Sequence, residues 1–495
     1  MDYTYSYVLR AALLTCCLSA SNAAQAETLP WMANLVADPF ASEQKASKLV
    51  YPDLKPDSCQ LPNTNRKLHF NEVVIAALCN NPDTKAAYLS LIEQAATYAS
   101  NYSSYLPNAA ANIARSRTTS FALDSKTSSV QSAYGVSLSM LLYDFGQREF
   151  KLETAELSLF AAGHSYNATL QALISSSMQG YYSLLTAQYG VDVAKESERY
   201  ARESYDAAKL RHKIGQVPLA DELQAEGAYS QSLLTDESAQ NTLALEKAAL
   251  ALLMGLPAAT PIQVADIDKK SLAKDPFQDK IEVLINEAKL KRPDLLATRE
   301  TLKAAEESLL ALKRSDLATI SATTNMDVGN NGPHLLNYSS THDQAIGITV
   351  SIPIFTGFSQ TYSERAAEKS LEAQRNELTK SELGVEQDVW NAWHNYETAK
   401  QSWKTSQVLF TSAVQLKDVA LGSYKEGLGS ILDVLNAESQ YSSALQSQLQ
   451  ARYNLLTTRV ALVDAVGVLD LNSMHPDTSF TANVGIASNA HEETR

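Results

Sequence analysis

The sequence predicts a mixed α/β membrane protein in which one structural unit occurs twice, giving four membrane β-strands and long antiparallel coiled-coil helices. Three observations predict this fold class. Landmark motifs recur at an offset of 211 residues, four segments alternate between apolar and small polar residues, and two helical runs are far longer than an ordinary globular helix. The repeat sets the organisation of the chain, and the strands and helices make up each copy.

The duplication is visible in four pairs of landmarks that keep nearly the same spacing along the chain. The pairs are NNPD (80–83) with KRPD (291–294), Gly146 with Gly357, IGQVPLADELQAE (214–226) with EGLGSILDVLNAE (426–438), and Met254-Gly255 with Val466-Gly467. The register slips by one residue over about 175 residues, which argues against chance. We therefore predict a first repeat over 68–256 and a second over 291–467, joined by a connection over 257–290.

Alternating apolar and polar residues predict two strands in each unit. The predicted strands are 109–123, 130–142, 318–328 and 343–354, forming β-hairpins over 109–142 and 318–354 with polar loops at 124–129 and 329–342. In 343–354 an apolar side chain occupies every second position from Ile346 to Ile354. Segment 109–123 is less regular, because Arg115 and Arg117 fall on the face with Ile113.

Strands of about ten residues have the length that a tilted membrane strand needs. A half-buried strand in a soluble sheet is the alternative interpretation. Four strands make a small sheet for 495 residues, however, and the sequence offers this sheet no other β partner. Open strand edges are not tolerated in lipid, so four strands would have to close with strands from other copies of the chain.

Two helical runs, Gly146–Lys213 and Gly357–Lys425, would each extend about 100 Å if continuous. A helix before the strands (83–105 or 294–315) and a return helix (218–254 in the first unit) together nearly match that length. Each unit is therefore expected to form an antiparallel coiled coil with one partner made of two stacked helices. A seven-residue stripe supports this: Leu371, Leu378, Val385, Ala392 and Ala399, with Val389, Tyr396, Trp403 and Phe410 offset by four.

The N-terminus has the pattern of a secretory signal over 1–26: Arg10, a short apolar run, and a small-x-small cleavage site at 24–26. Residues 27–67 would form an N-terminal periplasmic segment, and 468–495 a flexible C-terminal tail. If Cys16 and Cys17 leave with the signal, Cys59 and Cys79 remain, and an oxidising compartment favours a disulfide between them. Two free buried thiols, and lipidation at Cys16 or Cys17, are the alternatives.

The composition argues against several classes of function. A formal net charge of −14 argues against a nucleic-acid partner, which needs a basic face. The sequence contains no HExxH, GxSxG or P-loop motif, and GLG at 427–429 lies between helices rather than after a strand. His334 and His342 share a loop, but two histidines do not make a metal site. We expect no enzyme activity, no cofactor and no metal.

In their order and spacing these motifs resemble the outer membrane factor family, the TolC-like export channels. The carriers are YDFG and IFTG at the strand-to-helix turns around Gly146 and Gly357, NNPD and RPD at the unit starts, and YKEGLGSILDVLNAE at the second helix turn. The resemblance implies a homotrimer with a 12-stranded β-barrel continued by a 12-helix periplasmic α-barrel. CQLP (59–62) and ALCNNP (77–82) resemble the CyaE-type branch, which serves type I secretion of large toxins.

The resemblance also implies roles at the two helix turns, which would lie at the periplasmic tip. Gly215, Gly427 and Gly429 are expected to form tight turns that meet an adaptor protein. Tyr424, Asp433 and Asp221 match family positions that close the resting channel. Gly429 stands where the family has an arginine, and Asn436 replaces a second aspartate. The arginine-based closing network of the family is therefore not matched.

Helix capping is the alternative role for both aspartates. Ser430 and Asp433 form an S-x-x-D capping pattern, and Pro218 with Asp221 suits a first helical turn. A ring of three Asp433 carboxylates in a trimer is compatible with capping.

The primary hypothesis is an outer membrane channel with its helices in the periplasm, passively conducting substrate to the exterior. Its partners would be a periplasmic adaptor, an inner-membrane ABC transporter and outer membrane lipid, and its cargo a protein toxin in type I secretion. Segment 27–67 and the cysteine pair favour secretion. The alternative is a small-molecule (drug or metal) efflux channel paired with a proton-driven pump. A non-pore periplasmic coiled-coil scaffold is the second alternative.

Overall fold

A computed structural model describes residues 38–49, 64, 66–122, 125–266, 280–333 and 339–469. The predicted signal peptide 1–26 and Cys59 lie outside the described residues. So do most of segment 27–67, residues 267–279 of the connection, and the tail from residue 470.

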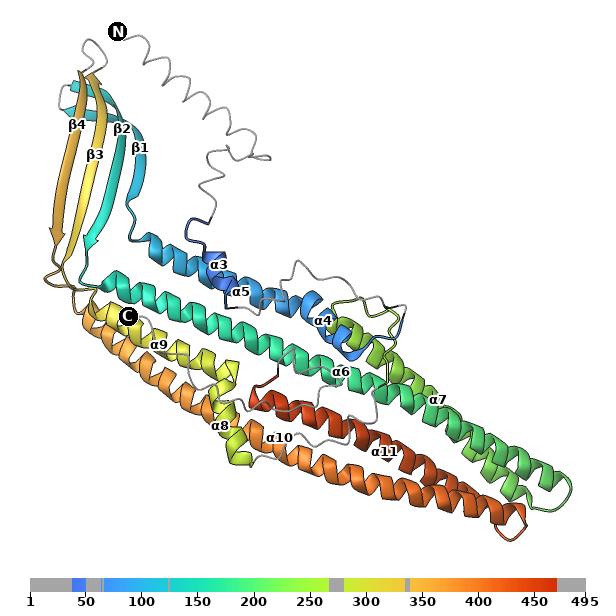
Figure 1. The fold of residues 1–495 in the computed structure, drawn as a ribbon. Helices are drawn as coiled ribbons and strands as arrows, with labels where there is room; N and C mark the ends of the chain where they lie inside the picture. Colours follow the sequence, from blue (N-terminus) through green and yellow to red (C-terminus); the bar gives the residue numbers. More distant parts are fainter. Residues whose placement is uncertain are drawn as a thin grey trace.

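The two halves of the described chain follow the same order of elements, with a sheet at one end of an elongated molecule and helical turns at the other (Figure 1). The first half contains α3 (Ser42–Ser47), α4 (Phe70–Asn80), α5 (Pro82–Ser103), β1 (Asn108–Ala122), β2 (Ser125–Tyr143), α6 (Gln147–Lys213) and α7 (Leu219–Leu253). The second half contains α8 (Ile281–Lys291), α9 (Pro293–Lys313), β3 (Thr319–Pro333), β4 (Ser339–Ser351), α10 (Ser359–Lys425) and α11 (Ile431–Val466).

The four strands form one antiparallel sheet in the order β1-β2-β3-β4, so β1 and β4 are its edges. The expected polar loops are shorter than predicted. Residues 125–129 belong to β2, and 329–333 and 339–342 belong to β3 and β4. Ladder hydrogen bonds are made by the backbone, so polar side chains at the hairpin ends do not prevent pairing. Strand β4 ends at Ser351, two residues before Pro353, which has no amide to donate.

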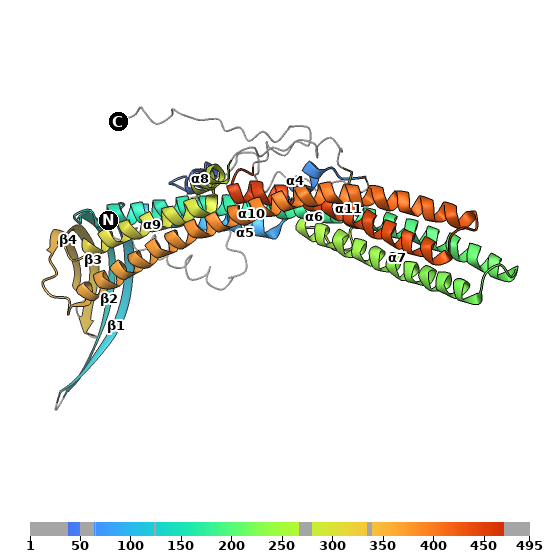
Figure 2. The same cartoon turned by 90° about the horizontal axis from the view of Figure 1, so that it is seen from below.

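Helices α6 and α10 have 67 residues each, which corresponds to about 100 Å. Helices α5 and α7 follow one another along α6, and α9 and α11 follow one another along α10. Helices α9 and α11 also contact α6, so the layer runs from α5/α7 through α6 and α9/α11 to α10 (Figure 1). Figure 2 shows the elongated molecule from below. The predicted stripe on α10 is confirmed: Val385, Val389, Ala392, Tyr396 and Ala399 are buried, and Leu378 and Trp403 pack against them.

The predicted helices 83–105 and 294–315 are confirmed as α5 and α9, but each is preceded by a short helix, α4 or α8, that was not predicted. Asn81 separates α4 from α5, and Arg292 separates α8 from α9, each just before a proline. Side helices α4 and α8 pack on α6 and α10 and close the main hydrophobic core.

The separations at Asn81 and Arg292 explain two of the repeated sequence landmarks, NNPD with KRPD and Met254-Gly255 with Val466-Gly467. A Cβ on Gly255 would lie 2.6 Å from the carbonyl oxygen of Asn80, and one on Gly467 would lie 2.9 Å from Cα of Arg292. Both glycines have positive φ. In each unit, the end of the return helix therefore contacts the break before the strands through a residue that must lack a side chain.

Candidate functional site

The two faces of the sheet differ in chemistry. Residues directly opposite one another in an antiparallel pair share a face, so the ladder places Tyr134, Val328 and Ile113 together. The other apolar residues on this face include Val136, Leu138, Met140, Met326, Ile346, Ile348 and Val350, and all of them are exposed. On the opposite face Asp327 lies over Gly135, where a Cβ would meet its carboxylate at 2.1 Å. One sheet therefore presents an uncovered apolar face and a polar face.

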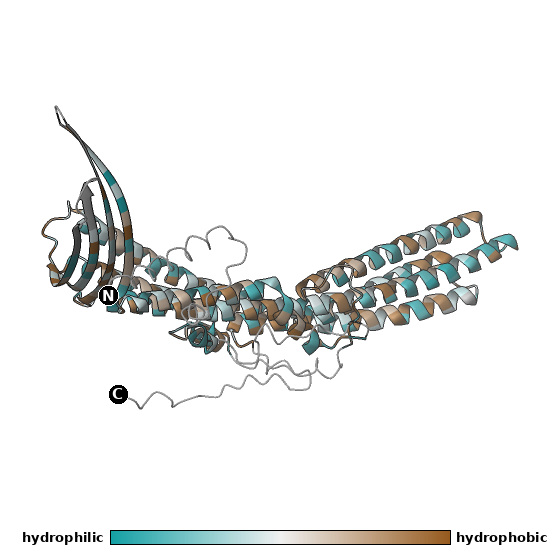
Figure 3. Ribbon diagram, turned by 90° about the horizontal axis from the view of Figure 1, so that it is seen from above, coloured by the Kyte–Doolittle hydropathy of each residue, from teal (hydrophilic) through white to brown (hydrophobic). Residues whose placement is uncertain are grey.

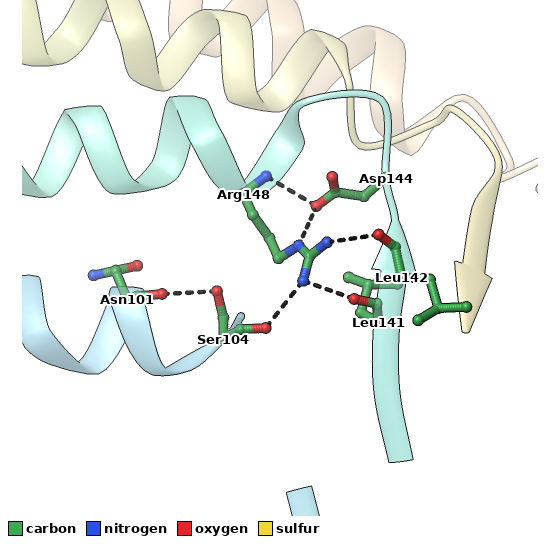
Figure 4. A network of polar contacts seen from close by, with 6 residues as sticks. All are labelled: Asn101, Ser104, Leu141, Leu142, Asp144 and Arg148. Carbon is green, nitrogen blue, oxygen red and sulfur yellow. Dashed lines mark hydrogen bonds and ion pairs between the residues drawn. The ribbon is translucent and has the colours of Figure 1, made fainter. Parts of the chain in front are cut away.

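At the first strand-to-helix junction, Arg148 joins three elements through one guanidinium group (Figure 4). Its Nε donates to Oδ2 of Asp144 at 2.9 Å, and Nη1 donates to the carbonyls of Leu141 at 2.8 Å and Ser104 at 3.2 Å. Asp144 is only 5% exposed and also accepts from the backbone amide of Arg148. The turn itself needs Gly146 with φ 90° and a left-handed Phe145. The network fixes the direction in which α6 leaves the sheet.

The second strand-to-helix junction is held by neutral hydrogen bonds at the position where the first has an ion pair. Gly357 has φ 67°, and Phe358 is also left-handed. Here Gln360 Nε2 donates to the carbonyl of Leu312 at 2.6 Å, and Ser315 Oγ donates to Gln360 Oε1 at 3.1 Å. Both junctions thus tie the end of the preceding helix to the start of the long helix.

The far end of the molecule consists of the α6–α7 and α10–α11 turns. Gly215 (φ 77°) and Gly427 (φ 78°) occupy the left-handed region, as the tight turns require. Gly429 does not; a Cβ there would lie 3.3 Å from Ser423 Cβ, so close approach rather than φ favours glycine. Leu428, between the last two glycines, is 86% exposed at the apex.

Tyr424 lies in a small buried cluster near this tip rather than at an open surface. It packs with Ala208 of α6, Ala225 of α7, and Ile431 and Val434 of α11. Its hydroxyl is buried without a hydrogen-bond partner. Arg211 of α6 stacks on its ring at 4.2 Å and donates to its backbone carbonyl at 3.3 Å. The contact joins the first coiled coil to the second, and sequence reasoning did not identify Arg211.

The aspartates at the tip lie in the first turns of their helices. Asp433 Oδ2 accepts from the backbone amide of Ser430 at 3.0 Å and from its hydroxyl at 2.7 Å, while Ser430 Oγ accepts from the amide of Asp433. This is a capping box, so the capping alternative for Asp433 is confirmed. The pKa of Asp433 is lowered, mainly by the hydrogen bond from the Ser430 hydroxyl and next by the one from the Ser430 amide. Asp221 is acidic in the first turn of α7, where it complements the helix dipole.

A second contact between the two units was also missed from the sequence. Lys417 of α10 lies 4.3 Å from the ring centre of Tyr200 of α6 and 4.1 Å from that of Tyr441 of α11. Beside it, Ser204 Oγ donates to the carboxylate of Glu438 at 2.9 Å, and burial raises the pKa of Glu438. Lys417, Tyr200 and Tyr441 belong to three different helices, and nothing in their local sequences indicates that they will be in contact.

Cys79 is buried in the main core and is disulfide-bonded. It is the only cysteine among the described residues, so the predicted pairing with Cys59 stays a prediction. Within the described ranges, no group of three or more His, Cys, Asp or Glu side chains could hold a metal ion. Polar and apolar positions are interspersed along the long helices (Figure 3), and none of the described helices is long and apolar enough to cross a membrane.

Comparison with known proteins places this geometry in a family. The family described as "Outer membrane efflux protein" matches the chain twice, over residues 73–256 and 284–468. Protein CyaE of Bordetella pertussis is 25% identical over 446 residues, covering 89% of this chain and 92% of CyaE. Outer membrane protein TolC of Vibrio cholerae is 25% identical over 340 residues, covering 68% of this chain and 76% of TolC.

A solved structure shows the same fold. The CmeC outer membrane channel of Campylobacter jejuni superposes with a TM-score of 0.72 at 19% identity, covering 81% of this chain and 87% of CmeC. Because the family matches both halves and most of the chain, the protein belongs to the outer membrane efflux protein family.

Proposed function

We propose that this protein is the outer membrane channel of a tripartite export system and passively conducts substrate from the periplasm to the exterior. The observation that carries the proposal is the sheet. It exposes an apolar face on all four strands and a polar face behind it, and it continues through two pinned junctions into helices of about 100 Å. A membrane-spanning wall joined to a periplasmic conduit has this construction.

The channel would be a homotrimer. Each chain leaves the edges β1 and β4 unpaired within its own sheet, and lipid does not tolerate open edges. Three copies would close a 12-stranded barrel. The same closure would join α7 of one copy to α10 of the next, giving 12 helices around the periplasmic conduit. Exposed apolar side chains on both outer helices support this: Leu223, Leu234, Leu245 and Leu252 on α7, and Leu383, Trp390, Val408 and Val419 on α10.

For the cargo we propose a protein toxin in type I secretion, with an ABC transporter and a periplasmic adaptor as partners. The similarity to CyaE, which extends over 89% of this chain, supports this branch. The alternative is small-molecule efflux with a proton-driven pump, and the description of the family as efflux proteins favours it. Energy in either case would come from the partners.

The tip would be both gate and adaptor contact. Asp433, Asp221 and Tyr424 would form the periplasmic gate, and the turns at Gly215, Gly427 and Gly429 would meet the adaptor. Asp433 is exposed and both hydrogen bonds that it accepts in the cap go to Oδ2, so capping leaves its other carboxylate oxygen available to a ring of three. The Arg211–Tyr424 contact ties the two coiled coils together at this level.

The test is single-channel conductance of the purified protein in a planar bilayer, comparing wild type with Asp433→Asn. Discrete openings with cation selectivity are expected for the wild type, and reduced cation selectivity for the variant. Asp192→Asn, at an exposed position of α6, is the control and should leave selectivity unchanged. A protein that stays soluble without detergent and never conducts would instead be the non-pore periplasmic scaffold.

A further inference from the structure

Two arginines on the edge strand β1 lie on the apolar face of the sheet. Arg115 pairs with Ser132 and Arg117 pairs with Val130, so both side chains share the face of Ile113. Both are exposed. An arginine within the lipid-facing band of a membrane sheet is costly, and the cost falls towards the interface. The position of the two arginines relative to the band therefore decides what they can do.

The ladder gives this position. On this face, Ile113, Tyr134 and Val328 lie side by side in one row, level with His342 on β4. It is the last row, going away from the helices, in which three strands carry apolar side chains. The rows from His342 to Val350 extend about 27 Å along the strand, and each carries an apolar side chain on at least one strand, which is comparable with an apolar band about 25 Å tall. Arg115 lies one row beyond this band and Arg117 two rows beyond it, at the end of the sheet away from the helices.

Their surroundings leave both guanidinium groups available. Arg115 has no hydrogen-bond or ion-pair partner among the described residues. Arg117 donates from Nε to Ser128 Oγ at 3.0 Å, which leaves its two terminal amino groups free to donate elsewhere. Asp327 of β3 lies on the opposite face, over Gly135. The rim of the apolar face thus carries positive charge without an acidic neighbour from β3.

We propose that Arg115 and Arg117 bind the phosphate groups of lipid headgroups in the leaflet farther from the helices. This inference rests on the proposed insertion of the sheet into the membrane. The arginine stem can lie along the apolar band while the planar guanidinium reaches the headgroup layer. Its forked donors match phosphate oxygens in pairs, which an ammonium group does not. The two residues would set the depth and tilt of the sheet on the outer side.

The test titrates the detergent-solubilised protein with bisphosphorylated lipid A and counts bound lipid by native mass spectrometry. The double variant Arg115→Gln/Arg117→Gln should bind roughly thirtyfold more weakly, because each arginine near an anionic headgroup is worth about fivefold. The double variant Arg199→Gln/Arg202→Gln removes the same charge from exposed positions of α6 and should bind like the wild type. Lysine at 115 and 117 should give an intermediate affinity, which separates binding from folding.

Three results would overturn the inference. Unchanged binding by the glutamine variant is the first, and equal wild-type binding of dephosphorylated lipid A is the second. The third is displacement of lipid A by micromolar inorganic phosphate, which would make free phosphate the ligand. If the glutamine variant aggregates while its lipid binding is unchanged, the arginines only protect the edge strand from pairing. Conductance in phosphatidylcholine bilayers separates this inference from the proposed function. If the wild type conducts there but the glutamine variant binds lipid A as the wild type does, only the inference is refuted.

Discussion

Asp433 shows how one carboxylate can serve the local backbone and still face solvent. Its Oδ2 atom accepts both hydrogen bonds of the capping box, from the amide and the hydroxyl of Ser430. These bonds favour the ionised form, which is why the pKa of Asp433 is lowered from its ordinary value of 3.8. The charge that a gate would need is therefore held in place by the turn that positions it.

This cap predicts a pH dependence for the first turn of α11. A group whose pKa is lower in the folded state contributes stability above its unfolded pKa, and that contribution is lost as pH falls through the folded pKa. Protection of the amides of Asp433 and Val434 from hydrogen exchange, corrected for intrinsic rates, should be constant from pH 7 to 5 and fall below about pH 4. Asp433→Asn should remove this acid-dependent loss. An equal loss in the variant would assign it to another group.

At the scale of elements, the junction between β2 and α6 depends on a charged pair that little water reaches. Arg148 is 11% exposed and Asp144 6% exposed at the side chain. The guanidinium also binds carbonyls at the ends of α5 and β2, so its loss would leave a buried carboxylate and several acceptors without donors. Arg148→Met should therefore lower the free energy of unfolding by about 3 kcal/mol.

The double variant Arg148→Met/Asp144→Asn should lose less than the single variant, because no buried charge is left unpaired. The measurement is urea unfolding in detergent, followed by far-ultraviolet circular dichroism. Arg299→Met, which breaks a more exposed pair with Glu382 on α10, is the matched control and should cost about 0.5 kcal/mol. If the single and double variants lose equally, the pair does not hold the junction.

Periodicity predicts these elements well because burial and pairing repeat along the chain. The long helices expected to end at Lys213 and Lys425 end there in the structure, and the stripe through Val389 and Tyr396 is buried. Periodicity does not say which element will cover a face in a duplicated chain. Arg211 on Tyr424, and Lys417 between Tyr200 and Tyr441, join helices from different repeats. No local pattern marks such contacts.

The expected gate residues show the same limit. The motif match placed Tyr424 and Asp433 at the tip, and the capping pattern of Ser430 and Asp433 was visible in the sequence. The burial of Tyr424 and its orphaned hydroxyl were not, since both depend on residues from α6 and α7. The helix starts at Pro82 and Pro293 were predicted from the sequence to within one residue, where a residue before proline disfavours helix, but the short helices α4 and α8 before them were not.

For the whole molecule, the decisive question is how copies of the chain meet. Within one chain α7 and α10 lie at opposite sides of the helical layer, with α6 and α11 between them. Helix α7 starts at the tip with Leu219, and α10 ends there with Lys425. Leu223 lies four residues from the start of α7 and Val419 six from the end of α10, while Leu234 and Val408 lie fifteen and seventeen residues away, so the members of each pair differ by only about 3 Å in height. All four side chains are more than half exposed, so trimer closure would bury them in pairs.

The double variant Leu234→Cys/Val408→Cys should therefore form disulfides between copies and give covalent trimers on non-reducing gels. The Cα atoms of two linked cysteines must approach to within about 7 Å, which only neighbouring helices allow. Each single variant should remain monomeric on the gel. The mismatched pair Leu252→Cys/Val419→Cys lies at different heights and should not cross-link. Equal cross-linking of the matched and mismatched pairs, or disulfides confined to one chain, would refute the α7–α10 contact and the barrel that follows from it.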